Sequence, residues 1–187
     1  KDPIADFLGS LHVIGDAPEL NDKRKADKTG KKEPNYPEHW PVTAEGRFGF
    51  PARGFKKAMV SACRYVEGIS MTEANGLVYV SGCEDDPELV EILGVDGKPA
   101  KAQMREDIVR LNNGPRPVPD IRHRAEFTHW SAVLKVKYNT KLITPEAIAN
   151  LFQTAGFHVG IGEDRPGRTG GSWGTFKVAG GSGLISA

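Results

Sequence analysis

A glycine-rich segment near the C-terminal end, residues 156–174, carries the side chains best suited to chemistry. Arg165, Arg168 and Trp173 are spaced among seven glycines there. Guanidinium groups hold phosphates through paired hydrogen bonds, and an indole ring can stack on a nucleic-acid base. Because glycine accepts positive φ and lets a second backbone come close, the segment is predicted to fold tightly around a ligand or a neighbouring element. The alternative is a long surface connection.

Two further groups of basic residues could bind phosphates. One covers a predicted strand and loop and includes a histidine: Arg105, Arg110, Arg116, Arg122, His123 and Arg124. The other covers the polar face of a predicted helix: Arg53, Lys56, Lys57 and Arg64. We expect the nucleic-acid site to combine the first group with the glycine-rich segment, since a groove with a stacking aromatic and flexible backbone suits a single strand. The glycines of this predicted site are Gly162, Gly167, Gly170 and Gly171.

The helix face is a secondary candidate, with a solvated surface as its alternative. Helices cover one face of the sheet in the expected fold, so this face and the sheet site need not form one surface.

The overall charge is too small for the protein to attract polyanions through its net charge. The formal net charge is +1, so a site for a polyanion must be a local patch. Residues 101–125 hold six Lys and Arg against three acids, an excess that the whole-chain balance conceals. A chain of 187 residues has room for one core, which predicts a single domain.

The cysteines and the hydropathy pattern indicate a reducing compartment. Cys63 and Cys83 give no disulfide framework, and the sequence contains no apolar run of transmembrane length. We expect no signal peptide, although the sequence begins at Lys1 and not at a methionine. We expect a cytoplasmic protein that neither binds membranes nor needs a cofactor or metal. The acidic turn 84–88 lacks the ligand spacing of a calcium loop.

Hydrophobic periodicity and turn residues predict the elements in order. A first strand and its turn occupy 1–18, and a polar insertion follows at 19–46, either mobile or ordered by a polyanion or a partner subunit. The predicted helices are Pro51–Val66, with apolar residues at helical spacing, and a second that has Thr144 as N-cap and Gly156 as its stop. The predicted strands are 77–80, 89–93, 104–111, 121–138 and 173–178, with a proline-rich loop at 112–120 and a flexible tail at 180–187.

This order predicts an α+β, ferredoxin-like (βαββαβ, RRM-like) single domain with a glycine-rich loop before the last strand. Residues 47–179 form the remainder of this domain after the insertion. The fold alone does not decide function, because it hosts enzymes and binding modules alike.

Three motifs carry a resemblance to a known family. They are the Ile-Gly-x-x-Pro turn ending at Pro18, the Gly-Phe-Pro-Ala opening of the first helix at Gly49, and the Gly-x-Gly-Glu-x-Arg-Pro loop with its Gly-x-Phe-x-Val strand ending at Val178. Over most of 47–178 the sequence resembles a widespread, uncharacterised family of bacteriophage proteins. More distantly it is similar to the RAMP superfamily, the RNA-binding backbone subunits and processing nucleases of CRISPR systems.

The resemblance implies that single-stranded nucleic acid binds across the sheet and the glycine loop, with subunits stacked in a row. The sequence departs from that pattern in its balanced charge, and the catalytic positions of the nucleases cannot be mapped onto any residue here.

These observations predict a phage protein that is not an enzyme, binds single-stranded RNA or DNA, and self-assembles along it as a homo-oligomer or a subunit of a larger assembly. One alternative is a structural protein that forms rings or filaments without nucleic acid. Another is a metal-independent ribonuclease that uses His123, whose flanking arginines would stabilise developing charge.

Overall fold

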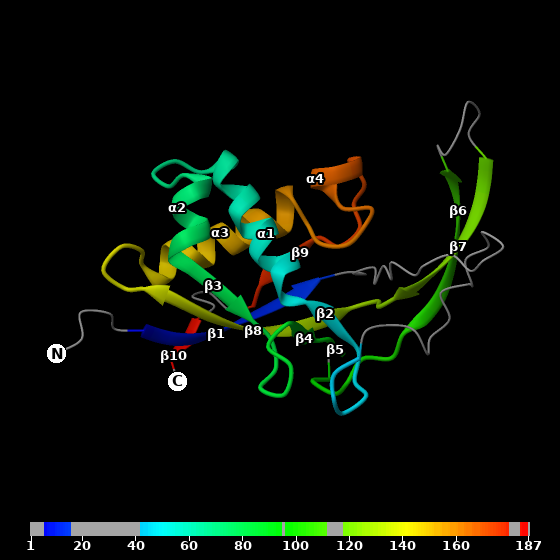
Figure 1. Cartoon of the computed structure of the whole chain (residues 1–187), viewed down its shortest axis with the longest axis horizontal. Coiled ribbons are helices and arrows are strands. Elements are labelled where there is room, and N and C mark those ends of the chain that lie inside the picture. The colour runs from blue at the N-terminus through cyan, green and yellow to red at the C-terminus, as the bar shows by residue number, and fades with distance from the viewer. Residues whose placement is uncertain (1–5, 16–41, 95, 112–117, 180–183, 187) are drawn as a thin grey trace, which may run out of the picture.

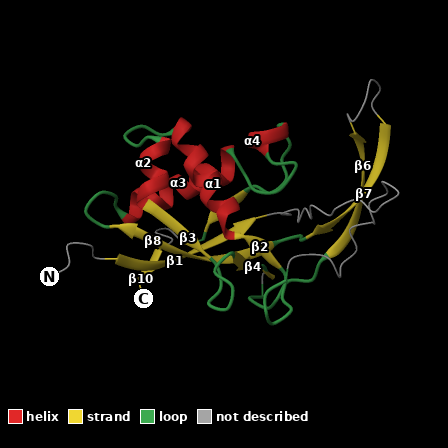
Figure 2. Ribbon diagram, viewed as in Figure 1, coloured by secondary structure: helices red, strands yellow, loops and turns green. Residues whose placement is uncertain are grey.

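The chain is a mixed α+β protein in which helices lie on one side of an antiparallel sheet and a separate hairpin projects from one end (Figure 1, Figure 2). The computed structural model describes residues 6–15, 42–94, 96–111, 118–179 and 184–186. The α+β class predicted from the sequence is confirmed.

Two long strands form the centre of the main sheet. Strands β1 (Asp6–Gly15) and β8 (Trp130–Asn139) pair antiparallel along their whole length, from Asp6 opposite Asn139 to Gly15 opposite Trp130. Two short strands pair along the outer edge of each of these long strands, and all four are antiparallel to the strand they pair with. Strands β9 (Phe176–Val178) and β10 (Leu184–Ser186) pair with β1, and β3 (Val78–Ser81) and β5 (Leu93–Gly94) pair with β8.

The two principal helices form where their caps and apolar stripes predict them. Helix α1 (Ala52–Ala62) follows Pro51 and buries Phe55 and Met59, and it continues into a 3-10 turn (Cys63–Tyr65). Helix α3 (Pro145–His158) begins after Thr144, whose hydroxyl accepts a hydrogen bond from the Ala147 amide at 3.2 Å. Helix α3 runs past the predicted stop at Gly156. Two short helices, α2 (Met71–Leu77) and α4 (Pro166–Thr169), were not predicted.

The core lies between the helices and the sheet. Alternate residues of β8 point into it, and Trp130, Leu134 and Val136 are almost fully buried, whereas Val133 on the other face is 42% exposed. The Phe55 ring of α1 packs against the indole of Trp130, with 6.2 Å between ring centroids. The prediction of a half-buried central strand is confirmed for 130–138.

The predicted long strand 121–138 is wrong at its middle. Strand β7 (Val118–Glu126) ends before Phe127, and β8 begins at Trp130 in a different sheet. Between them His129 has a φ of 54°, a left-handed conformation that turns the chain. A histidine at this position gives no indication of such a turn in the sequence.

Strand β7 pairs with β6 (Gln103–Leu111) as a two-stranded hairpin, from Gln103 opposite Glu126 to Leu111 opposite Val118. The predicted strand 104–111 is therefore confirmed, whereas residues 118–120, predicted as loop, belong to β7. Proline has no backbone N–H to donate. Pro119 is tolerated there because both strands of a two-stranded ribbon are edge strands, whose outer sides make no hydrogen bonds to a further strand. A second small sheet joins β2 (Gly49–Pro51) to β4 (Leu89–Glu91).

Three further differences concern the ends of elements. The last predicted strand begins at Phe176 rather than Trp173, because residues before it form a turn. Part of the predicted tail, Leu184–Ser186, pairs with β1 instead. Most of the predicted insertion 19–46 lies outside the described residues. Among the helices that the structure describes, none combines the length and hydropathy needed to cross a bilayer.

Candidate nucleic-acid interface

The base of the β6–β7 hairpin meets the glycine-rich segment, so two of the predicted basic groups lie together. Arg105 and Arg124 are cross-strand partners, and Asp107 lies two residues from Arg105 on the same face. The Arg105 guanidinium donates to the Asp107 carboxylate from Nε at 3.0 Å and from Nη2 at 2.8 Å. Arg124 donates from one nitrogen to Asp107 and from the other to Glu163 of the glycine-rich segment.

Trp173 closes this contact from the glycine-rich side. The guanidinium carbon of Arg105 lies 4.0 Å from the centroid of the indole ring, in cation–π geometry. The Arg105 side chain therefore bridges an acid on its own strand and an aromatic ring from a segment far along the sequence.

The ion pairs neutralise much of the positive charge that the sequence places here. Burial alone would raise the pKa of Asp107, but hydrogen bonds from Arg105 and Arg124 outweigh it and hold that pKa below its ordinary value. Asp107 is thus ionised at neutral pH. Because Arg105 and Arg124 contact Asp107 and Glu163, they fasten the hairpin to the loop, and a phosphate would have to compete with these carboxylates.

The larger of two neighbouring clefts lies at this junction and has a volume of about 570 Å³. Its arginines are Arg105, Arg110, Arg124 and Arg168, its acids are Asp107, Glu163 and Asp164, and Trp173 completes the wall. The four arginines exceed the three acids by one charge. Arg110 is exposed, and Arg168, 55% exposed, lies 4.0 Å from Glu163. These two side chains are the ones placed to meet a ligand in solution.

A second cleft, of about 260 Å³, lies between α1 and the glycine-rich segment. Its cations are Lys57 from α1 and Arg165 and Arg168 from the segment. Burial lowers the pKa of Arg165, and the nearby positive charge of Arg168 lowers it further. Arg168 and Glu163 line both clefts, so the clefts adjoin there.

The predicted secondary basic face contributes one residue to this region. Lys57 lines the second cleft, whereas Lys56 lies over the Tyr79 ring, 4.6 Å from its centroid. Arg53 and Arg64 are exposed and line neither cleft. Lys57 is therefore the residue of the predicted helix face that lies beside the glycine-rich segment.

The glycines of the segment shape the loop. Gly162 and Gly170 have positive φ, of 87° and 76°, which few other residues accept. Gly167 lies against Val159, and a side chain at Gly171 would meet the Asp164 backbone at 2.5 Å. The amide of Ile161 donates to the Gly174 carbonyl at 2.9 Å and closes the loop on itself.

His123 lies on the other face of the hairpin. Its Nε2 is 3.0 Å from Oε1 of Glu106, its cross-strand partner. Neighbouring side chains of a strand point to opposite faces, so Arg124 faces the glycine-rich segment and not the imidazole. The flanking arrangement that the ribonuclease hypothesis needs is therefore not formed by Arg124. Arg116 lies outside the described residues, as does the side chain of Arg122.

The acidic partners of Arg105 and Arg124, which are Asp107 and Glu163, were not predicted from the sequence. Their signal was present for Asp107, because residues two apart on a strand share a face and Arg105 and Asp107 have opposite charge. Glu163 carried no such signal, since its pairing with Arg124 depends on how the hairpin meets the loop.

Within the described ranges, no three His, Cys, Asp or Glu side chains gather in a way that could hold a metal ion. A comparison with protein-family models gave no match, and a comparison with curated proteins gave none either.

Proposed function

We propose that the protein binds single-stranded nucleic acid along the two adjoining clefts, without catalysis, and self-assembles along the strand. The observation that carries the proposal is the position of Arg168 between two clefts that also hold Arg110, Arg165 and Lys57. Three segments distant in sequence supply these cations. A phosphate backbone passing over Arg168 would meet positive charge on both sides.

A single strand suits the site better than a duplex. The local excess of charge is small, and a duplex is held largely through many phosphate contacts. The Arg105 guanidinium covers one face of the Trp173 indole. An unpaired base would stack on the opposite face, an interaction that duplex geometry does not provide.

We further infer that the domain is ferredoxin-like. Strands β9, β1, β8 and β3 are neighbours in that order and all antiparallel, and α1 and α3 lie in the two connections that lead to β3 and β9. The hairpin would then be an insertion before β8. The phage origin, the likeness to RAMP proteins and the cytoplasmic location belong to the same proposal and rest on the sequence.

The test is the anisotropy of fluorescent single-stranded RNA, single-stranded DNA and duplex over a salt series, with the Arg110→Ala/Arg168→Ala variant beside the wild type. Each lost phosphate contact lowers the slope of log K against log salt by about 0.7 for a single strand, so the double variant should lose about 1.4. The control is Lys98→Ala/Lys177→Ala, which removes two exposed lysines outside both clefts and should bind as the wild type does.

No binding to any oligonucleotide at low salt would overturn the proposal. Equal losses in the control and the cleft variant would show that binding follows net charge and not these clefts.

A structural protein that assembles without nucleic acid is the second candidate. The observation that favours it is the apolar surface on the hairpin, where Ile108 is 82% and Ile121 is 60% exposed. Assembly through such a surface should persist as salt rises, whereas binding of nucleic acid should weaken steeply.

A further inference from the structure

The smaller cleft, between α1 and the glycine-rich segment, carries positive charge that its own acid does not balance. Its acid is Glu163, and its cations are Lys57, Arg165 and Arg168. Three positive charges against one negative leave an excess of two, whereas the excess in the larger cleft is one. Glu163 is also engaged elsewhere, because its carboxylate accepts a hydrogen bond from Arg124 of the hairpin. An anion with two negative charges would therefore match the smaller cleft.

Arg165 is the cation of this cleft that gains most from an anion. Its side chain is half-buried, and it forms no ion pair with any residue that the structure describes. Its guanidinium donates from Nη1 to the carbonyl of Gly162, which is a neutral group. Burial lowers its pKa, and the charge of Arg168 lowers it further. A desolvated cation beside a second cation is stabilised when an anion binds close to both.

The remaining wall of the smaller cleft is apolar. Phe50, Ala58, Val159 and Ile161 are buried residues that line it. The Phe50 ring packs edge-on against Phe55, with 5.5 Å between ring centroids, so its position is fixed by the core. The volume of about 260 Å³ is slightly below the range of about 300–1,000 Å³ that holds drug-sized ligands. The cleft therefore suits a compact ligand with one ring system and an anionic group.

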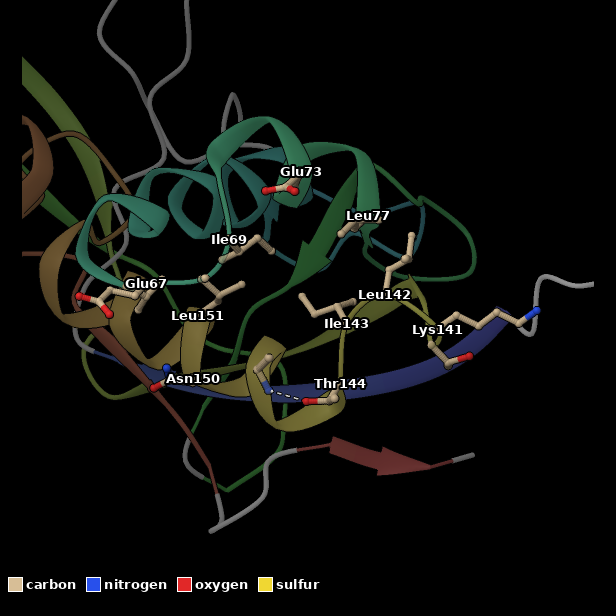
Figure 3. Close-up of a pocket in the computed structure, with 14 residues that line it drawn as sticks. Glu67, Ile69, Glu73, Leu77, Lys141, Leu142, Ile143, Thr144, Asn150 and Leu151 are labelled. Atoms are coloured by element: carbon tan, nitrogen blue, oxygen red, sulfur yellow. Dashed lines mark hydrogen bonds between the residues drawn. The ribbon is translucent and has the colours of Figure 1, made fainter.

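The cavity between α2 and the start of α3 has the opposite balance of charge. It has a volume of about 370 Å³, and Figure 3 shows Ile69 and Leu151 pointing toward one another in it. Two acids, Glu67 and Glu73, line this cavity together with one cation, Lys141. Its excess is one negative charge, which disfavours an anion. An excess of positive charge is thus a property of the smaller cleft and not of every cavity in the molecule.

We propose that the smaller cleft binds a phosphate monoester, with Lys57, Arg165 and Arg168 around the phosphate and the apolar wall against the sugar–base unit that carries it. A monoester has a charge of about −1.5 to −2 at pH 7, whereas each phosphodiester inside a strand has one negative charge. The charge of the cleft therefore favours the monoester.

Two sources could supply this group, a free mononucleotide and the phosphorylated end of a single strand. A strand end as the source rests on the proposed function, because the strand would run from the larger cleft over Arg168 and end in the smaller one. A free mononucleotide as the source does not rest on it.

The first measurement is isothermal titration calorimetry of the whole chain with adenosine 5′-monophosphate, and with adenosine as the probe that lacks the phosphate. The monophosphate should bind at least about tenfold more tightly. This advantage should shrink from about pH 7.5 to about pH 5.5, because a monoester takes up a proton near pH 6 and keeps one negative charge. The charged groups that face the phosphate are the three cations and Glu163.

The variant for this cleft is Lys57→Ala, an exposed position on α1 at which the fold should be kept. It should weaken binding of the monophosphate about tenfold and leave binding of adenosine unchanged, since it removes a hydrogen bond to a charged group. Arg165→Gln should weaken it at least as much, and circular dichroism checks its fold because Arg165 also holds Gly162. The control is Lys141→Ala, which removes the same charge from the cavity of Figure 3 and should bind as the wild type does.

The second measurement separates the two sources. It is the anisotropy of one fluorescent single strand carrying a 5′-phosphate, a 3′-phosphate or hydroxyl groups at both ends. About tenfold tighter binding of one phosphorylated strand, lost in Lys57→Ala, would support the strand end as the source. Equal binding of the three strands, together with tight binding of the monophosphate, would support the free mononucleotide.

The proposal would be overturned if neither the monophosphate nor a phosphorylated strand bound more tightly than its phosphate-free counterpart. Equal losses in Lys57→Ala and Lys141→Ala would also overturn it, since binding would then follow net charge. The proposed function fails in a different way. A chain that binds the monophosphate and no oligonucleotide would contradict the proposed function and leave this inference standing, whereas strand binding that ignores the ends, without binding of the monophosphate, would do the reverse.

Discussion

Asp107 shows why an arginine in a cleft is not automatically a ligand-binding residue. Both neighbouring guanidiniums direct their nitrogens to its carboxylate, and Arg124 reaches on to Glu163. In the larger cleft, the cations that remain for a phosphate are Arg110 and Arg168. Removing Asp107 would leave two partly buried charges with one acid fewer to balance them.

Asp107→Asn should therefore lower the free energy of unfolding by about 1.5–3 kcal/mol at neutral pH, the usual contribution of hydrogen bonds to a charged group. The folded pKa of Asp107 lies below its unfolded value of about 3.9. Its contribution is thus complete above that unfolded value and is lost as pH falls through the lower folded pKa. Urea unfolding at pH 7, 5 and 3 checks this, and the difference between the two proteins should shrink only below about pH 4.

Asp85→Asn, at an exposed carboxylate, is the control and should change the midpoint little at any pH. A loss from Asp107→Asn that is the same at pH 7 and pH 3 would mean that packing, and not the ion pair, is responsible.

At the scale of elements, the contact between α3 and β9 places the glycine-rich segment. A side-chain carbon at Gly156 would lie 1.8 Å from the Phe176 carbonyl oxygen, so only glycine lets the helix lie this close to the strand. This explains why a glycine stands inside α3, although glycine ends many helices.

Gly156→Ala should lower the free energy of unfolding by about 3 kcal/mol or more, since helix and strand must separate. Gly76→Ala in α2 is the matched comparison, because nothing lies within 4 Å of the position. That change should raise the free energy of unfolding by about 0.5–1 kcal/mol through the lost flexibility of the unfolded chain. Urea unfolding measures both, and a neutral Gly156→Ala would contradict the close approach.

Elements with a strong local signal could be predicted from the sequence. The stripe of α1 and the Thr144-Pro145 start of α3 are such signals. Helix α2 was missed although Ser70 and Glu73 form a capping box, with the Ser70 amide donating to the Glu73 carboxylate at 2.8 Å. The break at His129 and the pairing of Arg124 with Glu163 could not be predicted, because both depend on contacts between segments far apart in sequence.

For the whole molecule, the hairpin is the most separate part. It forms its own two-stranded sheet, and of its described side chains Ala125 alone belongs to the hydrophobic core. Gln103 and Glu126 are cross-strand neighbours, so a two-residue turn can join them directly.

Replacing residues 104–125 with Asn-Gly should leave a protein that unfolds cooperatively with its helical circular dichroism signal intact and its Tm lower by a few degrees. The same variant should lose much of its affinity for single strands, since Arg105, Arg110 and Arg124 of the larger cleft are gone. A broad, non-cooperative melt would show instead that the hairpin supports the core.

The pairing of β1 with β8 has a consequence for synthesis of the chain. The central strands of the sheet lie far apart in the sequence, with Asp6 opposite Asn139. At a synthesis rate of about 5–20 residues per second, β8 is made on the order of ten seconds after β1. During that time the apolar sequence of β1, Phe7 to Ile14, is an unpaired strand. A nascent-chain chaperone, or a neighbouring chain on the same polysome, would meet β1 before β8 does.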